Sequence, residues 1–196
     1  KKLNIDFITT PYDPISVNEV YNMGVRLFKT ASADLGDIYL HSKLGEFNDT
    51  RTFIATASAA ILKGAKVKFA DVDLDSGNIS SKTIEPLINS KTKAIAVVHL
   101  GGWPADIKNI SLLAKSYNLK LVEDCSQSHG AMFDNEYVGT FSDLSVWSFC
   151  NDKIISTLGE GGMIACKNKE IWKKLWAYKD CGKNYDKIFK KRKNNL

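Results

Sequence analysis

Residues 114–131 read AKSYNLKLVEDCSQSHGA, and this stretch decides the fold. A helical pattern ends near Tyr117, a short apolar run follows at 119–122, and the chain then turns polar at Glu123. A helix that leads into a buried strand, which in turn opens into a loop of acids, amides and hydroxyls, is typical of a β-α-β unit. The stretch therefore predicts an α/β protein with a parallel sheet.

The sequence also predicts the strand and the helix that precede this segment. TKAIAVVHL, residues 92–100, is the near-continuous apolar run that a buried parallel strand requires. A Gly-Gly-x-Pro turn breaks it, and Asp106 stands where it would cap a helix that runs to Tyr117. One face of that helix holds Ile107, Ile110, Leu113, Ala114 and Tyr117.

The alternation of strands and helices continues in both directions. We expect a strand at 66–73, a helix from Ser80 or Ser81 to Asn89, strands at 144–149 and 162–166, and a helix at 169–180. Repeated units of this kind imply a mostly parallel central sheet flanked by helices.

The composition is that of a globular protein that binds neither membranes nor nucleic acids. The content is 44% hydrophobic and 25% charged, and no apolar run is long enough to span a bilayer. The basic excess is confined to residues 167–196, which hold 11 of the 27 Lys and Arg residues. Aromatic residues do not interleave with these charges as in a single-strand groove, so we expect a solvated, frayed terminus.

The four cysteines are Cys125, Cys150, Cys166 and Cys181, and no two have C-x-x-C spacing. We therefore expect no metal ligand set, and mostly buried, reduced thiols in a cytoplasmic protein. The first residue is not Met and no signal sequence opens the chain, which is compatible with a fragment or a processed form.

Two segments at strand ends carry groups suited to chemistry. The strand at 119–122 opens into residues 123–130, and the strand at 144–149 opens into residues 150–153, which end in Lys153. In parallel sheets, ligands bind beyond the carboxyl ends of the strands. A carboxylate that holds a ring-nitrogen proton and a lysine that forms an imine are the pair that a pyridine-aldehyde cofactor needs. From spacing alone, a helix cap at Asp124 and a surface charge at Lys153 explain the same residues.

The motifs themselves resemble the DegT/DnrJ/StrS family of sugar aminotransferases. The similar segments are VEDCSQSHGA (122–131), VGTFSDL (138–144), WSFCNDKII (147–155), GEGGM (159–163), VHLGGWPAD (98–106) and TFIATA (52–57). They stand in the family's order and at its usual intervals, from about residue 52 to the end. The resemblance implies the large domain of a fold type I enzyme that uses pyridoxal 5'-phosphate (PLP).

The resemblance also implies roles for single residues. Lys153 would form the Schiff base with PLP and move the proton, and Asp124 would pair with the pyridine nitrogen. Gln127 would bond the phenolic oxygen of the ring, Ser148 would contact the phosphate, and Phe53 would stack on the ring face. For His129, which lies in the same motif, a structural role is favoured because no partner is evident in the sequence.

The implied reaction moves an amino group from an amino acid, glutamate by the resemblance, to a keto-sugar nucleotide. Such enzymes serve surface-polysaccharide or amino-sugar biosynthesis and form homodimers. Two alternatives stay open: a non-catalytic or incomplete remnant of the family, and a sugar dehydratase that uses PLP or its amine form, PMP. Those dehydratases usually lack the lysine, so Lys153 argues against the second alternative.

Three features depart from the family pattern. Residues 1–51 do not read like the family, and the small-residue, phosphate-binding segment expected before Phe53 has only a poor counterpart at 30–33. The chain also stops where family members continue into a smaller C-terminal domain, so we expect 52–196 to be a partial PLP-binding domain. Finally, Leu158 stands where Gly, or no residue, is more usual.

Overall fold

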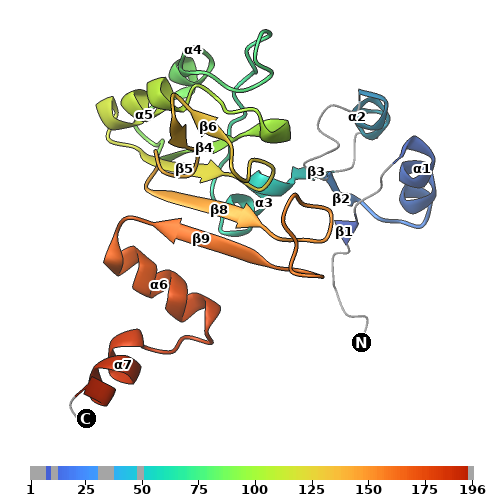
Figure 1. Ribbon diagram of the computed structural model, residues 1–196. Coiled ribbons are helices and arrows are strands. Elements are labelled where there is room, and N and C mark those ends of the chain that lie inside the picture. Colours follow the sequence, from blue (N-terminus) through green and yellow to red (C-terminus); the bar gives the residue numbers. More distant parts are fainter. Residues whose placement is uncertain (1–7, 10–12, 31–37, 48–50, 194–196) are drawn as a thin grey trace. The chain divides into compact units, whose positions relative to one another are not determined.

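The computed structural model describes residues 8–9, 13–30, 38–47 and 51–193, and the chain divides into two compact units. The first unit comprises Lys1–Phe69 and the second comprises Ala70–Leu196. Figure 1 shows the elements of both units, which are described separately below.

The first unit has a three-stranded parallel sheet in the order β1-β2-β3. Its elements are β1 (Ile8–Thr9), α1 (Pro14–Asn22), β2 (Leu27–Thr30), α2 (Ile38–Gly45), β3 (Arg51–Ile54) and α3 (Ala55–Leu62). Helix α1 begins at a proline after Asp13, whose carboxylate accepts the N–H groups of Ile15 and Ser16. Val17 of α1 and Leu44 of α2 form a small core.

The second unit is built on a four-stranded sheet in the order β4-β5-β8-β9. Its strands are β4 (Ala94–Val98), β5 (Lys120–Asp124), β8 (Leu144–Ser148) and β9 (Gly162–Cys166), with a short hairpin of β6 (Met132–Phe133) and β7 (Glu136–Tyr137). Its helices are α4 (Ser81–Ile84), the 3-10 turns η2 (Glu85–Leu87) and η3 (Leu100–Gly102), α5 (Ile107–Ser116), α6 (Lys169–Lys179) and α7 (Tyr185–Lys193). The first three strands of the sheet are parallel, and β9 is antiparallel to β8. The expectation of a mostly parallel sheet with helices is confirmed.

The core of this unit lies between one face of the sheet and helix α5. Alternate residues of a strand point to opposite faces, so Ile95 and Val97 of β4 share a face with Leu121 of β5. The buried residues of α5 that pack against this face are Ile107, Ile110, Leu113 and Ala114. Asp106 caps the helix as expected, whereas Tyr117 lies at its C-cap and is exposed.

Two expected elements upstream differ from the structure. Residues 66–71 form no strand, and Val72 makes only an isolated bridge with Ile79. An alternating pattern becomes a strand only where a neighbouring strand completes its hydrogen bonds, and among the described residues none pairs with this segment. The expected helix to Asn89 ends as α4 and η2, because Pro86 has no N–H with which to continue an α-helix.

The basic tail and the cysteines also need correction. Residues 185–193 form helix α7 and are not frayed: Tyr185 packs edge-on against Trp172 and Trp176 of α6, with ring centroids 4.8 and 5.3 Å apart. All four cysteines are free thiols as expected, but only Cys125 is buried.

Among the described residues, no helix is long and apolar enough to cross a membrane.

Candidate functional site

The predicted site residues of the second unit gather where strands β4, β5 and β8 end. Val98 pairs with Asp124 across β4 and β5, and Asp124 pairs with Val146 across β5 and β8. Paired residues of parallel strands point to the same face, and Ser148 lies two residues beyond Val146. Asp124 and Ser148 therefore share one face of the sheet, opposite to the face that packs on α5.

Asp124 is the last residue of β5 and is only 9% exposed. Its Oδ1 accepts the backbone N–H of Ser126 at 3.1 Å, a bond that restrains the carboxylate. A buried carboxylate at a strand end is suited to binding a protonated ring nitrogen, because such charge-assisted hydrogen bonds are about twice as strong as neutral ones.

Gln127 lies three residues further, in the loop after β5. Its Oε1 accepts the N–H of Gly101 at 2.8 Å, which ties this loop to the end of β4. Since the amide oxygen takes that bond, the amide NH₂ group is oriented as the donor end of the side chain. A donor is what an ionised phenolic oxygen requires.

Ser148 ends β8, and its Oγ accepts the N–H of Cys150 at 3.3 Å. A hydroxyl that accepts one bond still carries a proton that it can donate to a phosphate oxygen. Lys153 follows in the turn, where its own N–H donates to the Cys150 carbonyl at 3.0 Å.

The Lys153 ammonium lies 2.7 Å from the Asp152 carboxylate, and the lysine side chain is only 16% exposed. The hydrogen bond from Lys153, followed by the one with Cys150, holds the pKa of Asp152 below its ordinary value. In this structure the Lys153 ammonium is thus held by the carboxylate of its neighbour in the chain.

The loop that carries Lys153 is closed at its base. Phe149 donates its N–H to the Gly161 carbonyl at 2.8 Å, and its own carbonyl accepts the N–H of Thr157 at 3.0 Å. A β-carbon at Gly161 would lie 2.4 Å from Thr157 Oγ1, so a side chain at this position would require Thr157 to move.

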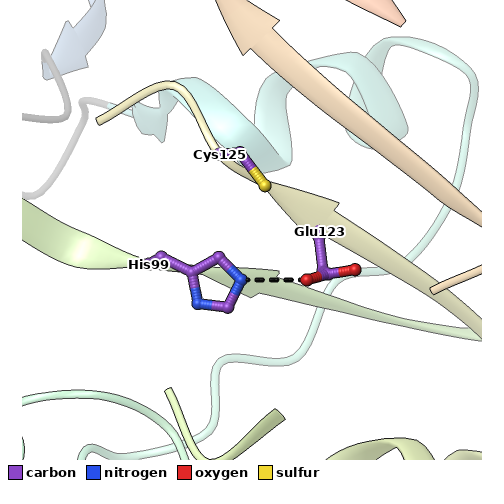
Figure 2. A group of neighbouring side chains, drawn as sticks. All are labelled: His99, Glu123 and Cys125. Carbon is purple, nitrogen blue, oxygen red and sulfur yellow. Dashed lines mark hydrogen bonds and ion pairs between the residues drawn. The ribbon is translucent and has the colours of Figure 1, made fainter. Parts of the chain in front are cut away.

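A buried polar group of His99, Glu123 and Cys125 lies on the opposite face, and Figure 2 shows the His99 ring directed at the Glu123 carboxylate. Glu123 is 0% exposed and its carboxylate accepts four hydrogen bonds. The donors are His99 Nε2 at 3.2 Å and the backbone N–H groups of Gly139 at 2.7 Å, Phe141 at 3.1 Å and Ser142 at 2.9 Å. We call Glu123 with these four donors the Glu123 clamp.

The hydrogen bonds assign the charges within the clamp. His99 Nδ1 accepts the N–H of Ala105 at 3.1 Å, so the ring proton is assigned to Nε2, which donates to Glu123. Burial by itself raises the pKa of Glu123, but the bonds from His99, Ser142 and Gly139 outweigh it and leave the pKa below its ordinary value. The clamp is therefore a neutral imidazole beside an ionised carboxylate.

The same three side chains are of the kinds that bind metal ions, and one potential ligand atom from each lies within 4.8 Å of the others. However, the hydrogen bonds above already occupy both ring nitrogens and both carboxylate oxygens. Burial, followed by the charges of Glu123 and then Asp124, raises the pKa of the Cys125 thiol to about 12, so this sulfur stays protonated. The group as it stands is a hydrogen-bond cluster and not a metal centre.

The structure thus brings Asp124, Gln127, Ser148 and Lys153 to one edge of one sheet. Phe53 lies in β3 of the other unit, and its side chain is outside the described residues, as are residues 31–33 of the sought phosphate segment. Both ring nitrogens of His129 are buried without a hydrogen-bond partner among the described residues, and the ring lies 5.7 Å from that of Phe149.

Sequence reasoning missed His99 and Glu123. Their signal was the strand alternation: His99 continues the row Ile95–Val97, and Glu123 continues the row from Leu121. Polar residues in a core row require each other as partners.

The donor set fits PLP. A buried carboxylate, an amide donor, a hydroxyl and a lysine lie at adjacent strand ends, and these are the groups that a pyridinium, a phenolate, a phosphate and an aldehyde require. The partnerless nitrogens of His129 lie in the same loop.

The fold is that of an α/β protein, and this donor set lies at the ends of its parallel strands. The model of the DegT/DnrJ/EryC1/StrS aminotransferase family matches residues 48–195, and the chain belongs to this family, whose enzymes use PLP. GDP-perosamine synthase of Escherichia coli O157:H7 is 42% identical over 133 residues, which are 68% of this chain and 36% of that enzyme.

Two solved structures show the same fold. An aminotransferase from Psychrobacter cryohalolentis is 44% identical with a TM-score of 0.68, over 69% of this chain and 34% of that one. NtdA of Bacillus subtilis, solved with bound cofactor PMP, is 32% identical with a TM-score of 0.58, over 63% of this chain and 27% of that one. The chain spans about a third of the length of these relatives.

Proposed function

We propose that this chain is the cofactor-binding part of an aminotransferase that moves an amino group from an amino acid, glutamate by preference, to a keto-sugar nucleotide. The observation that carries the proposal is the convergence of Asp124, Gln127, Ser148 and Lys153 at one edge of the sheet. The name of the E. coli relative, a GDP-perosamine synthase, supports a nucleotide-linked sugar as the acceptor.

When bound, PLP supplies an aldehyde carbon and an electron-accepting ring. In the proposed site Asp124 keeps a proton on the ring nitrogen, and Gln127 donates to the phenolic oxygen. Ser148 donates to the phosphate. Lys153 Nζ is the amine that would attach the cofactor through its aldehyde carbon, and it would carry protons to and from the substrate.

Lys153 also separates the two catalytic alternatives. The sugar dehydratases of the same family usually lack this lysine, so its presence favours amino-group transfer. The proposal includes a homodimer, as the resemblance to the family implies.

The first test is the location of bound PLP. The protein should take up PLP, and borohydride reduction followed by peptide mass mapping should place the label on Lys153. Lys153→Ala should lose the label and transamination together. Lys120→Ala, which removes another ion-paired lysine at the far end of β5, is the matched control and should keep both. Label on any other lysine would overturn the assignment.

The second test concerns Asp124. Asp124→Asn should weaken PLP binding and lower the transamination rate by about 100-fold, the scale of a few kcal/mol for a lost charge-assisted bond. Asp143→Asn removes a carboxylate that bonds to the first residues of β5, remote from the site, and should leave both quantities unchanged. Wild-type rates in Asp124→Asn would contradict the proposed role.

A further inference from the structure

Glu123 and Asp124 are neighbours on β5, and they differ in the direction of their side chains. Successive residues of a strand point to opposite faces. Asp124 shares its face with Ser148, whereas Glu123 lies on the core face with Leu121, His99 and Ser145. Glu123 therefore does not reach a ligand on the Asp124 face, and any effect that it has on the site is transmitted through the strand.

The donors of the Glu123 clamp come from the two segments that flank the end of β5. His99 directly follows β4, and Gly139, Phe141 and Ser142 form the segment that leads into β8. Gly139 is held a second time, because Ser145 Oγ donates to its carbonyl at 2.8 Å. One carboxylate thus joins the ends or entrances of all three parallel strands.

The hydrogen bonding of the clamp matches a carboxylate and no other side chain. Each oxygen accepts two bonds, and all four partners are donors. A glutamine would present an NH₂ group to two N–H donors, which leaves those contacts repulsive. His99 contributes as a neutral donor whose position is set by Ala105.

We propose that Glu123 is a positioning residue: the Glu123 clamp fixes the carboxyl end of β5 and so holds the Asp124 carboxylate where it meets the ring nitrogen of PLP. This inference rests on the proposed function, since it takes PLP as the ligand of Asp124. It assigns to each member of the Glu-Asp pair a different task, one toward the ligand and one toward the scaffold.

The test is a double-mutant cycle on PLP affinity, measured by absorbance titration below the unfolding temperature of every variant. Glu123→Gln should weaken PLP binding by about 10- to 100-fold, the scale known for groups that orient ligand-binding side chains. In an Asp124→Asn background the same substitution should change the affinity by less than about twofold, because the contact that it positions is already gone. Asp143→Asn is the matched control, with no effect in either background.

A second variant covers the case in which Glu123→Gln does not fold. His99→Asn retains an acceptor near Ala105 but does not reach Glu123, so it removes one bond of the four. It should show a smaller loss of PLP affinity with the same dependence on Asp124. Amide hydrogen exchange at Gly139, Phe141 and Ser142 should be faster in either variant, even without PLP.

The outcomes separate the two proposals. Equal losses of affinity in both backgrounds, or unchanged affinity in folded Glu123→Gln, would overturn the positioning role while leaving the proposed function intact. A wild-type protein that does not bind PLP at Lys153 would overturn the proposed function, and this inference with it.

Discussion

Leu158 shows what a single departure from a family pattern does to the backbone. It lies in the loop after Lys153 with φ at 61°, in the left-handed region, and its side chain is 99% exposed. That region costs a non-glycine residue about 1 kcal/mol, and an exposed leucine gains no burial in return. The glycine more usual at this position is thus explained by the backbone.

We predict that Leu158→Gly raises the free energy of unfolding by about 0.5–1 kcal/mol, as measured by urea denaturation. Leu158→Ala is the matched control, because it removes the side chain but keeps the left-handed backbone, and it should change stability by less than about 0.5 kcal/mol. A stabilisation of equal size in both variants would point to the side chain and not to φ.

Glu123 gives the protein a component of stability that depends on pH. Its pKa is lower in the folded state, so the unfolded chain binds the proton more tightly. The stabilisation is therefore complete above the unfolded pKa of about 4.3, and it is lost as the pH falls through the lower folded value.

We predict that Glu123→Gln costs about 3 kcal/mol or more of unfolding free energy near neutral pH. The difference between wild type and variant should shrink as the pH falls below about 4, since the wild-type carboxylate then becomes neutral too. Urea unfolding at a series of pH values measures this difference. A gap that stays constant down to about pH 2 would show that the charge of Glu123 is not involved.

At the scale of elements, the segment from Gly139 to Ser148 shows how a turn and a strand constrain each other. Gly139 has φ at 89°, and a β-carbon there would lie 2.4 Å from the ring of Trp147 in β8. The same residue donates to Glu123 and accepts from Ser145. Only glycine meets all of these conditions.

We predict that Gly139→Ala lowers the free energy of unfolding by about 2–4 kcal/mol, from the strained backbone and the overlap with Trp147 together. Gly130→Ala is the matched control: its φ of 77° is also left-handed, but nothing lies within 4 Å of the added carbon. It should cost about 1 kcal/mol. Equal losses in thermal or urea unfolding would mean that the tryptophan ring moves aside freely.

These elements also show which parts of the fold can be predicted from the sequence. The strands at 94–98, 120–124 and 144–148 and the helix after Asp106 follow from apolar runs and a capping residue, which are local signals. The strand expected at 66–73 fails, because alternation does not tell whether a partner strand exists. The resemblance to the family predicts four residues that lie at one edge of the sheet. The hydrogen-bond partners of Glu123 could not be predicted in this way, because they come from segments that are distant in the sequence.

At the scale of the whole molecule, the edge strand β9 of the second unit is a candidate surface for association between copies. Within the described residues β9 pairs only with β8, and Met163 and Ile164 on it are about half exposed. Ile154, Ile155 and Leu158 of the preceding loop are exposed as well. By contrast, Trp172 and Trp176 of α6 are partly covered by Tyr185 and Phe189 of α7.

We predict that the protein self-associates at micromolar concentration, because an unpaired strand edge beside exposed apolar side chains favours contact between copies. Sedimentation velocity should show a species larger than the monomer. Ile164→Lys places a charge on β9 and should shift the distribution toward monomer, whereas Tyr178→Lys, on an exposed position of α6, should not. A wild-type monomer at all concentrations would contradict this prediction.

The Glu123 clamp has a consequence for the time course of folding. Its bonds join residues that are 16 to 24 positions apart in the chain, and each of them forms only when β5 has met either the end of β4 or the segment into β8. We predict that these contacts form after the rate-limiting step of folding, and contacts of that kind mainly slow unfolding. A chain without the clamp should refold in stopped-flow experiments at nearly the wild-type rate but open many times faster, and the carboxylate would then govern how long each folded molecule lasts.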